Sequence, residues 1–303
     1  MLPLPHLDDA AASNDAVIEA FRDIDVVALD VDGTLLAESS SSVSDQIVEL
    51  HRVLASHRAP IDFVLVTGRP WAGVRNMVRA FEVAAGRRAP HVVHFGSVVT
   101  DRTGTSALRR ASIPPQTVRE IVDVYRDHGL APSAIQCDGD LSETHWRVGE
   151  LRRDDPAMTY GFGVPIRVVS KLPAGIEGQA VLAKTEVEVA GRVLADLATL
   201  GTGLPMEYHA PSRILYVDSP GASKAEGLLF ALREMGISPE RTLAVGDAAP
   251  DISMFDSVRF GVAVASAEAD VVEAADFVCS NGPSGAVVEV LELLLAARAD
   301  GKS

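Results

Sequence analysis

The sequence predicts an α/β fold, in which a doubly wound parallel sheet carries an inserted α+β domain. Three observations support this prediction. Short apolar runs alternate with segments of helical periodicity in the first and last thirds of the 303-residue chain, as in a parallel sheet covered by helices. The middle of the chain breaks this alternation. Acidic residues follow two of the apolar runs within two positions, at the strand ends where such sheets bind ligands.

Each expected strand is a short apolar run, and each expected helix lies next to such a run. In chain order the strands are Val26–Leu29, Phe63–Val66, Val92–Phe95, Thr242–Val245, Gly261–Val264 and Phe277–Cys279. The helices are Ser44–Ser56, Trp71–Phe81, Ala222–Met235, Pro250–Phe255 and Val287–Ala297. In the third helix, apolar residues recur at helical spacing and Gly236 supplies a stop.

The middle of the chain has a different pattern. Helical periodicity at Thr117–His128 and Val187–Leu200 lies among strand-like stretches at Val164–Ser170 and Gln179–Lys184. We therefore expect residues 101–204 to form an inserted α+β domain. Residues 1–100 and 205–303 are expected to form the core, since a chain of this length is more often two domains than one.

Composition restricts the partners and the compartment. The net charge of −15 argues against nucleic acid and against an anionic membrane surface. The two cysteines, Cys137 and Cys279, are far apart and in no metal-type spacing, which fits a reducing compartment. No signal peptide is evident, and no apolar run approaches the ~20 residues that span a bilayer. We expect a cytoplasmic monomer or homodimer.

Two acids follow the first strand, in the stretch VVALDVDGTLL. Asp30 and Asp32 end a buried-looking run, and Gly33 then turns the chain. Two carboxylates at a strand end can hold Mg²⁺, which takes one or two carboxylates together with phosphate oxygens. A simple turn is the alternative, because Asp-Gly pairs are common turn sequences.

Two further stretches offer groups for an anion. Thr67 and Gly68 end the second strand; the hydroxyl could donate to a phosphoryl oxygen, and the glycine lets the backbone approach a ligand. The alternative is that Thr67 caps the next helix. Lys224, one of four lysines, lies in the first turn of a predicted helix, where the dipole disfavours a cation. It is either a point charge aimed at an anion or a solvated surface lysine.

A second pair of acids follows a later strand, in TLAVGDAAPDISMF. Asp247 ends the strand and Asp251 lies in the first turn of the next helix, which Pro250 suits as a first residue. A helix acid favoured by the dipole is the alternative for Asp251. Because these acids belong to the same sheet as the first pair, the pattern favours one shared site.

In order and spacing, the four stretches resemble the motifs of the haloacid dehalogenase (HAD) superfamily phosphatases. DVDGTLL is similar to motif I, VTG to motif II, Lys224 to motif III and GDAAPD to motif IV. The similarity continues through FGVAVASAEADVVEAADFVCSNGPSGAV, so it extends from Val26 to about Leu295. In size and position, the insertion resembles the C2 cap of the Cof-type subfamily. The resemblance implies a Rossmann-like core with an inserted α+β cap.

The resemblance also implies roles for these residues. Asp30 would be the nucleophile that forms an aspartyl-phosphate, and Asp32 the general acid and base. Thr67, Gly68 and Lys224 would bind the transferring phosphoryl group.

Mg²⁺ is the implied cofactor. The Asp30 side chain, the Asp32 backbone carbonyl and Asp247 would hold it, with Asp251 supporting the site. The implied activity is hydrolysis of a small phosphorylated metabolite, such as a sugar phosphate. Two alternatives stay open: a phosphomannomutase-like phosphotransferase, and a catalytically impaired HAD-fold binding or regulatory protein.

Two residues depart from the family pattern. Pro250 and Phe95 stand where the family has Asn, but neither is an implied nucleophile, acid/base or principal metal ligand, so activity is expected to persist. Arg69 is interpreted as a solvated arginine at a helix start, with a substrate contact as the alternative. His91 and His94 are interpreted as structural.

Overall fold

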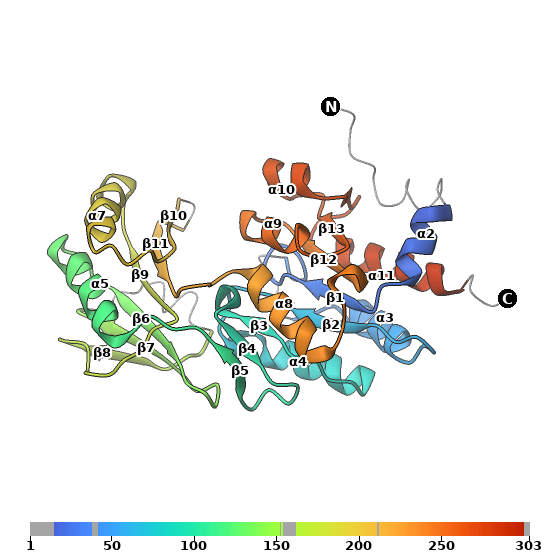
Figure 1. Ribbon diagram of the computed structural model, residues 1–303, viewed down its shortest axis with the longest axis horizontal. Helices are drawn as coiled ribbons and strands as arrows, with labels where there is room; N and C mark the ends of the chain where they lie inside the picture. The colour runs from blue at the N-terminus through green and yellow to red at the C-terminus, as the bar shows by residue number, and fades with distance from the viewer. Residues whose placement is uncertain (1–14, 38–41, 152, 154–161, 211, 300–303) are drawn as a thin grey trace.

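A computed structural model describes residues 15–37, 42–151, 153, 162–210 and 212–299 (Figure 1). Its central sheet has five parallel strands in the order β14–β13–β12–β1–β2. A bridge between Val66 and Val92 places β3 beside β2. The resulting order reverses between β1 and β12, as it does in Rossmann-like sheets, and the predicted fold class is confirmed. The strands are β1 (Val26–Leu29), β2 (Asp62–Leu65), β3 (Val92–Val93), β12 (Thr242–Gly246), β13 (Phe260–Ala263) and β14 (Phe277–Val278).

Helices cover both faces of this sheet. Val27 and Leu29 pack with residues of the helices on one face, whereas Val26 and Ala28 pack with those on the other. Both faces are therefore buried, which is why these strands are continuous apolar runs. The first face carries α2 (Asp15–Arg22), α3 (Asp45–Ala55), α4 (Trp71–Ala85) and α11 (Gly285–Ala299), and the second carries α8 (Lys224–Met235), α9 (Ala249–Phe255) and α10 (Ala269–Ala274). Among the helices of the described residues, none has both the length and the apolar composition needed to cross a membrane.

A second sheet of six strands lies at the far end of the molecule from the core helices α2 and α11 (Figure 1). Its order is β10–β11–β9–β6–β7–β8, and α5 and α7 pack against it. The strands are β6 (Ser133–Cys137), β7 (Glu143–Val148), β8 (Ile166–Val169), β9 (Ala180–Lys184), β10 (Met206–His209) and β11 (Ile214–Asp218), and the helices are α5 (Pro115–Asp127) and α7 (Val187–Thr199).

The strand pairing gives this inserted unit different boundaries from residues 101 and 204, which were expected from the sequence. Strands β4 (Val98–Thr100) and β5 (Ala107–Arg110) form a small antiparallel sheet with β3, although β5 was expected in the insertion. Strands β10 and β11 follow the expected boundary at residue 204, yet β11 pairs with β9 of the second sheet. The division into core and cap stays a prediction, and sheet membership puts its second boundary after Asp218.

The expected strand Val92–Phe95 is wrong at its end. Only Val92 and Val93 are extended, and His94 and Phe95 adopt left-handed backbone angles with φ of 50° and 52°. The turn brings Gly96 against the start of α8, where a Cβ atom at this glycine would lie 1.9 Å from the carbonyl oxygen of Ser223. Close backbone contact therefore ends the strand early.

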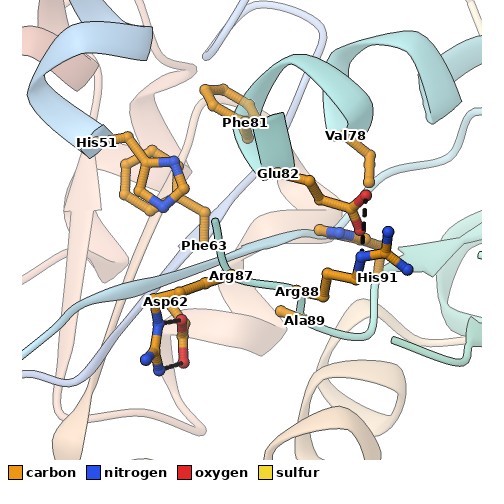
Figure 2. A pocket seen from close by; sticks show the side chains of 10 residues that line it. All are labelled: His51, Asp62, Phe63, Val78, Phe81, Glu82, Arg87, Arg88, Ala89 and His91. Atoms are coloured by element: carbon orange, nitrogen blue, oxygen red, sulfur yellow. Dashed lines mark hydrogen bonds and ion pairs between the residues drawn. The ribbon is translucent and has the colours of Figure 1, made fainter. Parts of the chain in front are cut away.

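Two buried histidines line a small pocket between α3, α4 and β2 (Figure 2). The His51 ring stacks on Phe63 with centroids 3.7 Å apart, and neither of its nitrogens has a partner among the described residues. His91 accepts the Leu65 N–H through Nδ1 at 3.1 Å. Burial lowers the pKa of His51 to about 4 and that of His91 to about 3. The structure therefore supports the structural interpretation of His91.

The lowered pKa values of His51 and His91 predict that the protein loses stability in mild acid. Their pKa values lie below the ordinary value of 6.5, so protonation favours the unfolded chain and stability falls as the pH drops from 6.5 towards 4. His51→Phe should remove about 3 kcal/mol of that loss by pH 4. Denaturant unfolding at several pH values measures it. The exposed His209 offers the control variant His209→Phe, which should unfold like the wild type; an unchanged pH slope in His51→Phe would contradict the prediction.

Candidate active site

The predicted acids lie at the carboxyl ends of the two central strands, where the strand order reverses. Asp30 directly follows β1 and Asp247 directly follows β12. Thr67 follows β2 at the same edge, and Lys224 is the first residue of α8. Parallel strands end together, so residues separated by two hundred positions in the sequence meet at one place.

Lys224 links two of the acids. Its Nζ donates to Asp30 Oδ1 and to Asp251 Oδ1, each at 2.6 Å. All three side chains are buried, with relative exposures of 4%, 6% and 0% for Lys224, Asp30 and Asp251. A buried ammonium this close to two carboxylates is not a solvated surface lysine, and that alternative from the sequence is excluded.

Asp251 anchors the loop between β12 and α9. Its Oδ2 accepts the backbone N–H groups of Asp247 and Ala248, both at 3.0 Å. Both oxygens of Asp251 are thus engaged, one by Lys224 and one by the backbone. Pro250 lies in the first turn of α9, where a missing N–H leaves no helical bond unmade. The departure from Asn at this position is therefore compatible with the local structure.

Asp247 is held from the turn that follows the first strand. Thr34 is fully buried, and its hydroxyl donates to Asp247 Oδ1 at 2.7 Å. Gly33 has a φ of +81°, and a Cβ atom there would lie 2.1 Å from Asp247 Oδ2. Thr34 is not among the site residues expected from the sequence, although its hydroxyl two residues after Asp32 was a visible signal.

Charge at this cluster is unbalanced, because three carboxylates face one ammonium. Burial raises the pKa of Asp30 well above its usual range, against the opposing effect of Lys224, and Asp251 raises it further. Burial also raises the pKa of Asp247. For Lys224, the carboxylates of Asp251 and Asp30 outweigh burial and raise the pKa of the ammonium, so it stays charged. The excess negative charge favours an added cation.

The donor set fits a hard divalent cation. Oxygen atoms of Asp30, Asp247 and Asp251 lie within 4.8 Å of one another, and Mg²⁺ is bound in proteins through one or two carboxylates. Because both oxygens of Asp251 are engaged, Asp30 and Asp247 are the acids that would contact the ion. The Asp32 backbone carbonyl is the third predicted ligand. It belongs to the same turn as Gly33, which packs on Asp247.

Gly33→Ala should weaken Mg²⁺ binding by at least about tenfold, because the added methyl group displaces Asp247. Titration calorimetry with Mg²⁺ measures the affinity. Gly86→Ala is the matched control, since Gly86 also has a positive φ of +65° but nothing within 4 Å of its Cβ position. Equal affinities in the two variants would show that the contact with Asp247 is irrelevant.

Asp32 does not join this cluster through its side chain. Both of its oxygens accept from Arg69, Oδ2 from Nε at 2.8 Å and Oδ1 from Nη2. The Arg69 side chain is only 11% exposed, and its guanidinium lies 4.4 Å from the centroid of the Phe162 ring. The interpretation of Arg69 as a solvated arginine is therefore wrong. The sequence could not show this pair, because it depends on the direction in which the Arg69 side chain extends.

Gly68 lies under an aromatic ring. A Cβ atom at this glycine would lie 2.3 Å from Phe95, and the Phe95 ring meets Tyr216 of β11 at 6.5 Å between centroids. The Thr67 hydroxyl accepts the N–H of Arg69 at 3.1 Å. Phe95, which stands where the family pattern has Asn, therefore contacts both Gly68 of the predicted phosphate-binding segment and Tyr216 of the second sheet.

The fold and this cluster define an α/β protein with a lysine-bridged acidic site at the switch point of its sheet. The family model of the haloacid dehalogenase-like hydrolases matches residues 27–291, and the chain belongs to this family. A haloacid dehalogenase-like hydrolase from Bacteroides thetaiotaomicron has a similar structure, with a TM-score of 0.74 and 20% identity over 89% of this chain and 98% of that one. A subclass IIB sugar phosphatase of the superfamily gives a TM-score of 0.62, with 20% identity over 84% and 92%.

Curated relatives include several phosphoglycolate phosphatases. The one from Halorubrum lacusprofundi is 28% identical over 255 residues, covering 84% of this chain and 90% of that protein. The one from Methanoculleus marisnigri is 37% identical, but the match spans only 30% of this chain and 38% of that protein. A third, from Saccharolobus solfataricus, is 34% identical over 30% of this chain and 44% of that protein.

Proposed function

We propose that this protein is an Mg²⁺-dependent phosphomonoester hydrolase that works through an aspartyl-phosphate on Asp30. The observation that carries the proposal is Lys224, which is buried and bonded to both Asp30 and Asp251 at 2.6 Å. An ammonium fixed beside a carboxylate nucleophile can offset the charge of an incoming phosphate dianion. The names of the phosphatase relatives support the same class of reaction.

The proposed cycle has two displacements. The Asp30 carboxylate, oriented by Lys224 through Oδ1, attacks phosphorus while the bond to the leaving oxygen breaks and Asp32 gives that oxygen a proton. Asp32 then takes a proton from water, whose oxygen attacks phosphorus and releases phosphate and the Asp30 carboxylate. Splitting the transfer in this way replaces one hard step with two easier ones.

The hydrogen bonds of each site residue indicate its proposed role. Bound Mg²⁺ would withdraw charge from the phosphoryl oxygens. Asp251 uses both oxygens for Lys224 and the backbone, so its proposed role is to position the lysine and the Asp247 loop. Asp32 uses both oxygens for Arg69, so proton transfer requires this pair to separate when substrate binds.

We further propose that the substrate is a small phosphorylated metabolite, with sugar phosphates and phosphoglycolate as the first candidates. The second sheet is proposed to act as a cap over the site, because Tyr216 of β11 meets Phe95 beside Gly68. A cap of this kind excludes bulk water and large substrates. The names of similar proteins, a sugar phosphatase and phosphoglycolate phosphatases, supply the two candidates.

The test is phosphate release from p-nitrophenyl phosphate and from a panel of sugar phosphates and phosphoglycolate. Release is expected with Mg²⁺, and it is expected to stop when a chelator removes the metal. For hexose phosphates, product analysis separates free phosphate from an isomerised sugar phosphate. Metal-independent release would contradict the proposed cofactor, and isomerisation without release would identify a phosphotransferase instead.

A further inference from the structure

A second cluster of metal-ligating side chains lies at the joint between the core and the second sheet. Cys137 ends β6 and Glu143 begins β7, and the two residues are direct cross-strand partners. His94 reaches them from the short turn that follows β3. One ligand atom from each of these three residues lies within 4.8 Å of the others, and all three side chains are buried.

Glu143 is held in place by the core. Its Oε1 accepts the backbone N–H of Trp71 at 2.7 Å and its Oε2 accepts that of Ala72 at 2.9 Å, at the start of α4. His94 Nε2 lies 2.7 Å from Glu143 Oε1. A carboxylate oriented by outer hydrogen bonds is typical of metal sites. The same bonds also describe a metal-free pair that caps α4, so His94 and Glu143 alone do not define a metal site.

Two neighbours distinguish this cluster from a simple histidine–carboxylate pair. Among the described residues, the Cys137 thiol, which lies within the same radius, makes one weak contact, with the Asp138 carbonyl at 3.7 Å. His145 shares a face of β7 with Glu143, is 4% exposed, and has no hydrogen-bond partner at either ring nitrogen among the described residues. Either of these imidazole nitrogens can bind a metal.

We propose that His94, Cys137 and Glu143 form a binding site for a divalent transition metal, best matched by Zn²⁺, with His145 as an adjacent donor. Imidazole, thiolate and carboxylate together are the ligand set of tetrahedral zinc. Thiolate excludes Mg²⁺ as the preferred occupant, which separates this site from the all-oxygen cluster around Asp30. Placing the ion requires the 2.7 Å contact between His94 and Glu143 to open to roughly 3.3 Å.

A metal at this position would fasten the second sheet to the core. Cys137 and Glu143 belong to β6 and β7, whereas His94 belongs to the core segment after β3. Binding would release the thiol proton of Cys137 into solvent and shift the proton between His94 Nε2 and Glu143 Oε1 to His94 Nδ1, so that two metal bonds replace this hydrogen bond. The bound ion would thus limit movement of the second sheet, while the chemistry of the acidic site would need no change.

The test is titration of the full chain with Co²⁺, in excess Mg²⁺ so that the acidic site is filled. Binding at the proposed site should produce a near-ultraviolet thiolate-to-cobalt band, which Zn²⁺ should abolish by competition. Metal analysis after dialysis should find Zn²⁺ bound at one equivalent. An absent band, or Zn²⁺ lost on dialysis, would overturn the proposal and leave the metal-free pair.

Two cysteine variants complete the test. Cys137→Ser should lose the band and weaken Zn²⁺ binding more than about tenfold. Cys279→Ser is the matched control, because Cys279 is the other buried cysteine and directly follows β14 at the outer edge of the central sheet; it should keep both the band and the Zn²⁺ affinity. A band that survives in Cys137→Ser would also overturn the proposal. Zn²⁺ should raise the melting temperature of the wild type and of Cys279→Ser but not of Cys137→Ser, provided circular dichroism shows all three folded.

Discussion

Asp30→Asn is expected to lower phosphate release by at least about a thousandfold, because the amide cannot form the acyl phosphate. The folded state should tolerate the change. Burial and the nearby acids raise the pKa of Asp30, which means that the fold disfavours its charged form, and a neutral amide of the same size removes that repulsion. Steady-state kinetics and thermal unfolding together measure both effects.

The matched control for this variant is Asp45→Asn, which changes an exposed acid in the first turn of α3. It should leave turnover and melting temperature unchanged. If Asp30→Asn kept wild-type turnover, the assignment of the nucleophile would be wrong. If it lost turnover only because it unfolded, the melting curve would reveal that directly.

Lys224→Met should lower both activity and stability. Removing the ammonium leaves the buried carboxylates of Asp30 and Asp251 without their partner, and breaking a buried ion pair costs about 3–5 kcal/mol. Because the pKa of Asp30 is already raised, its carboxyl group can take up a proton as the pH falls, so the loss of stability should be larger at pH 8 than at pH 5. Added Mg²⁺ should restore part of it.

Urea unfolding with and without Mg²⁺ at the two pH values measures these effects. Lys171→Met supplies the control, since Lys171 is an exposed lysine on the second sheet's side of the molecule. Its unfolding free energy should match that of the wild type at both pH values. A stability loss in Lys224→Met that does not depend on pH would contradict the account of unpaired charge.

The core could be predicted from the sequence because its strands are buried on both faces. The run Val26–Leu29 matches β1 residue for residue, since no polar position interrupts a strand between two helix layers. Burial in the second sheet is less regular: β10 alternates between half-buried and exposed residues, and β6 has two half-buried residues among its buried ones. That weaker pattern is why β6, β7, β10 and β11 were absent from the expected elements, and why the boundary was placed at residue 204.

The candidate site was predictable for a similar reason. Asp30 and Asp247 each end a strand of one parallel sheet, and that topology alone brings them together. Contacts that depend on side-chain reach were not predictable. Arg69 turns back to Asp32 rather than outward, and Glu143 crosses from the second sheet to the start of α4. No local pattern in the sequence encodes either contact.

The central claim is that a phosphoryl group is transferred to Asp30, and one experiment tests it directly. In Asp32→Asn, p-nitrophenyl phosphate can still react, because its leaving group needs no proton, whereas hydrolysis of the intermediate lacks its base. We expect a rapid burst of nitrophenol equal to the enzyme concentration, followed by slow turnover. After acid quenching, mass spectrometry should locate one phosphoryl group on the peptide that contains Asp30. No burst, or a phosphoryl group on another peptide, would contradict the proposed mechanism.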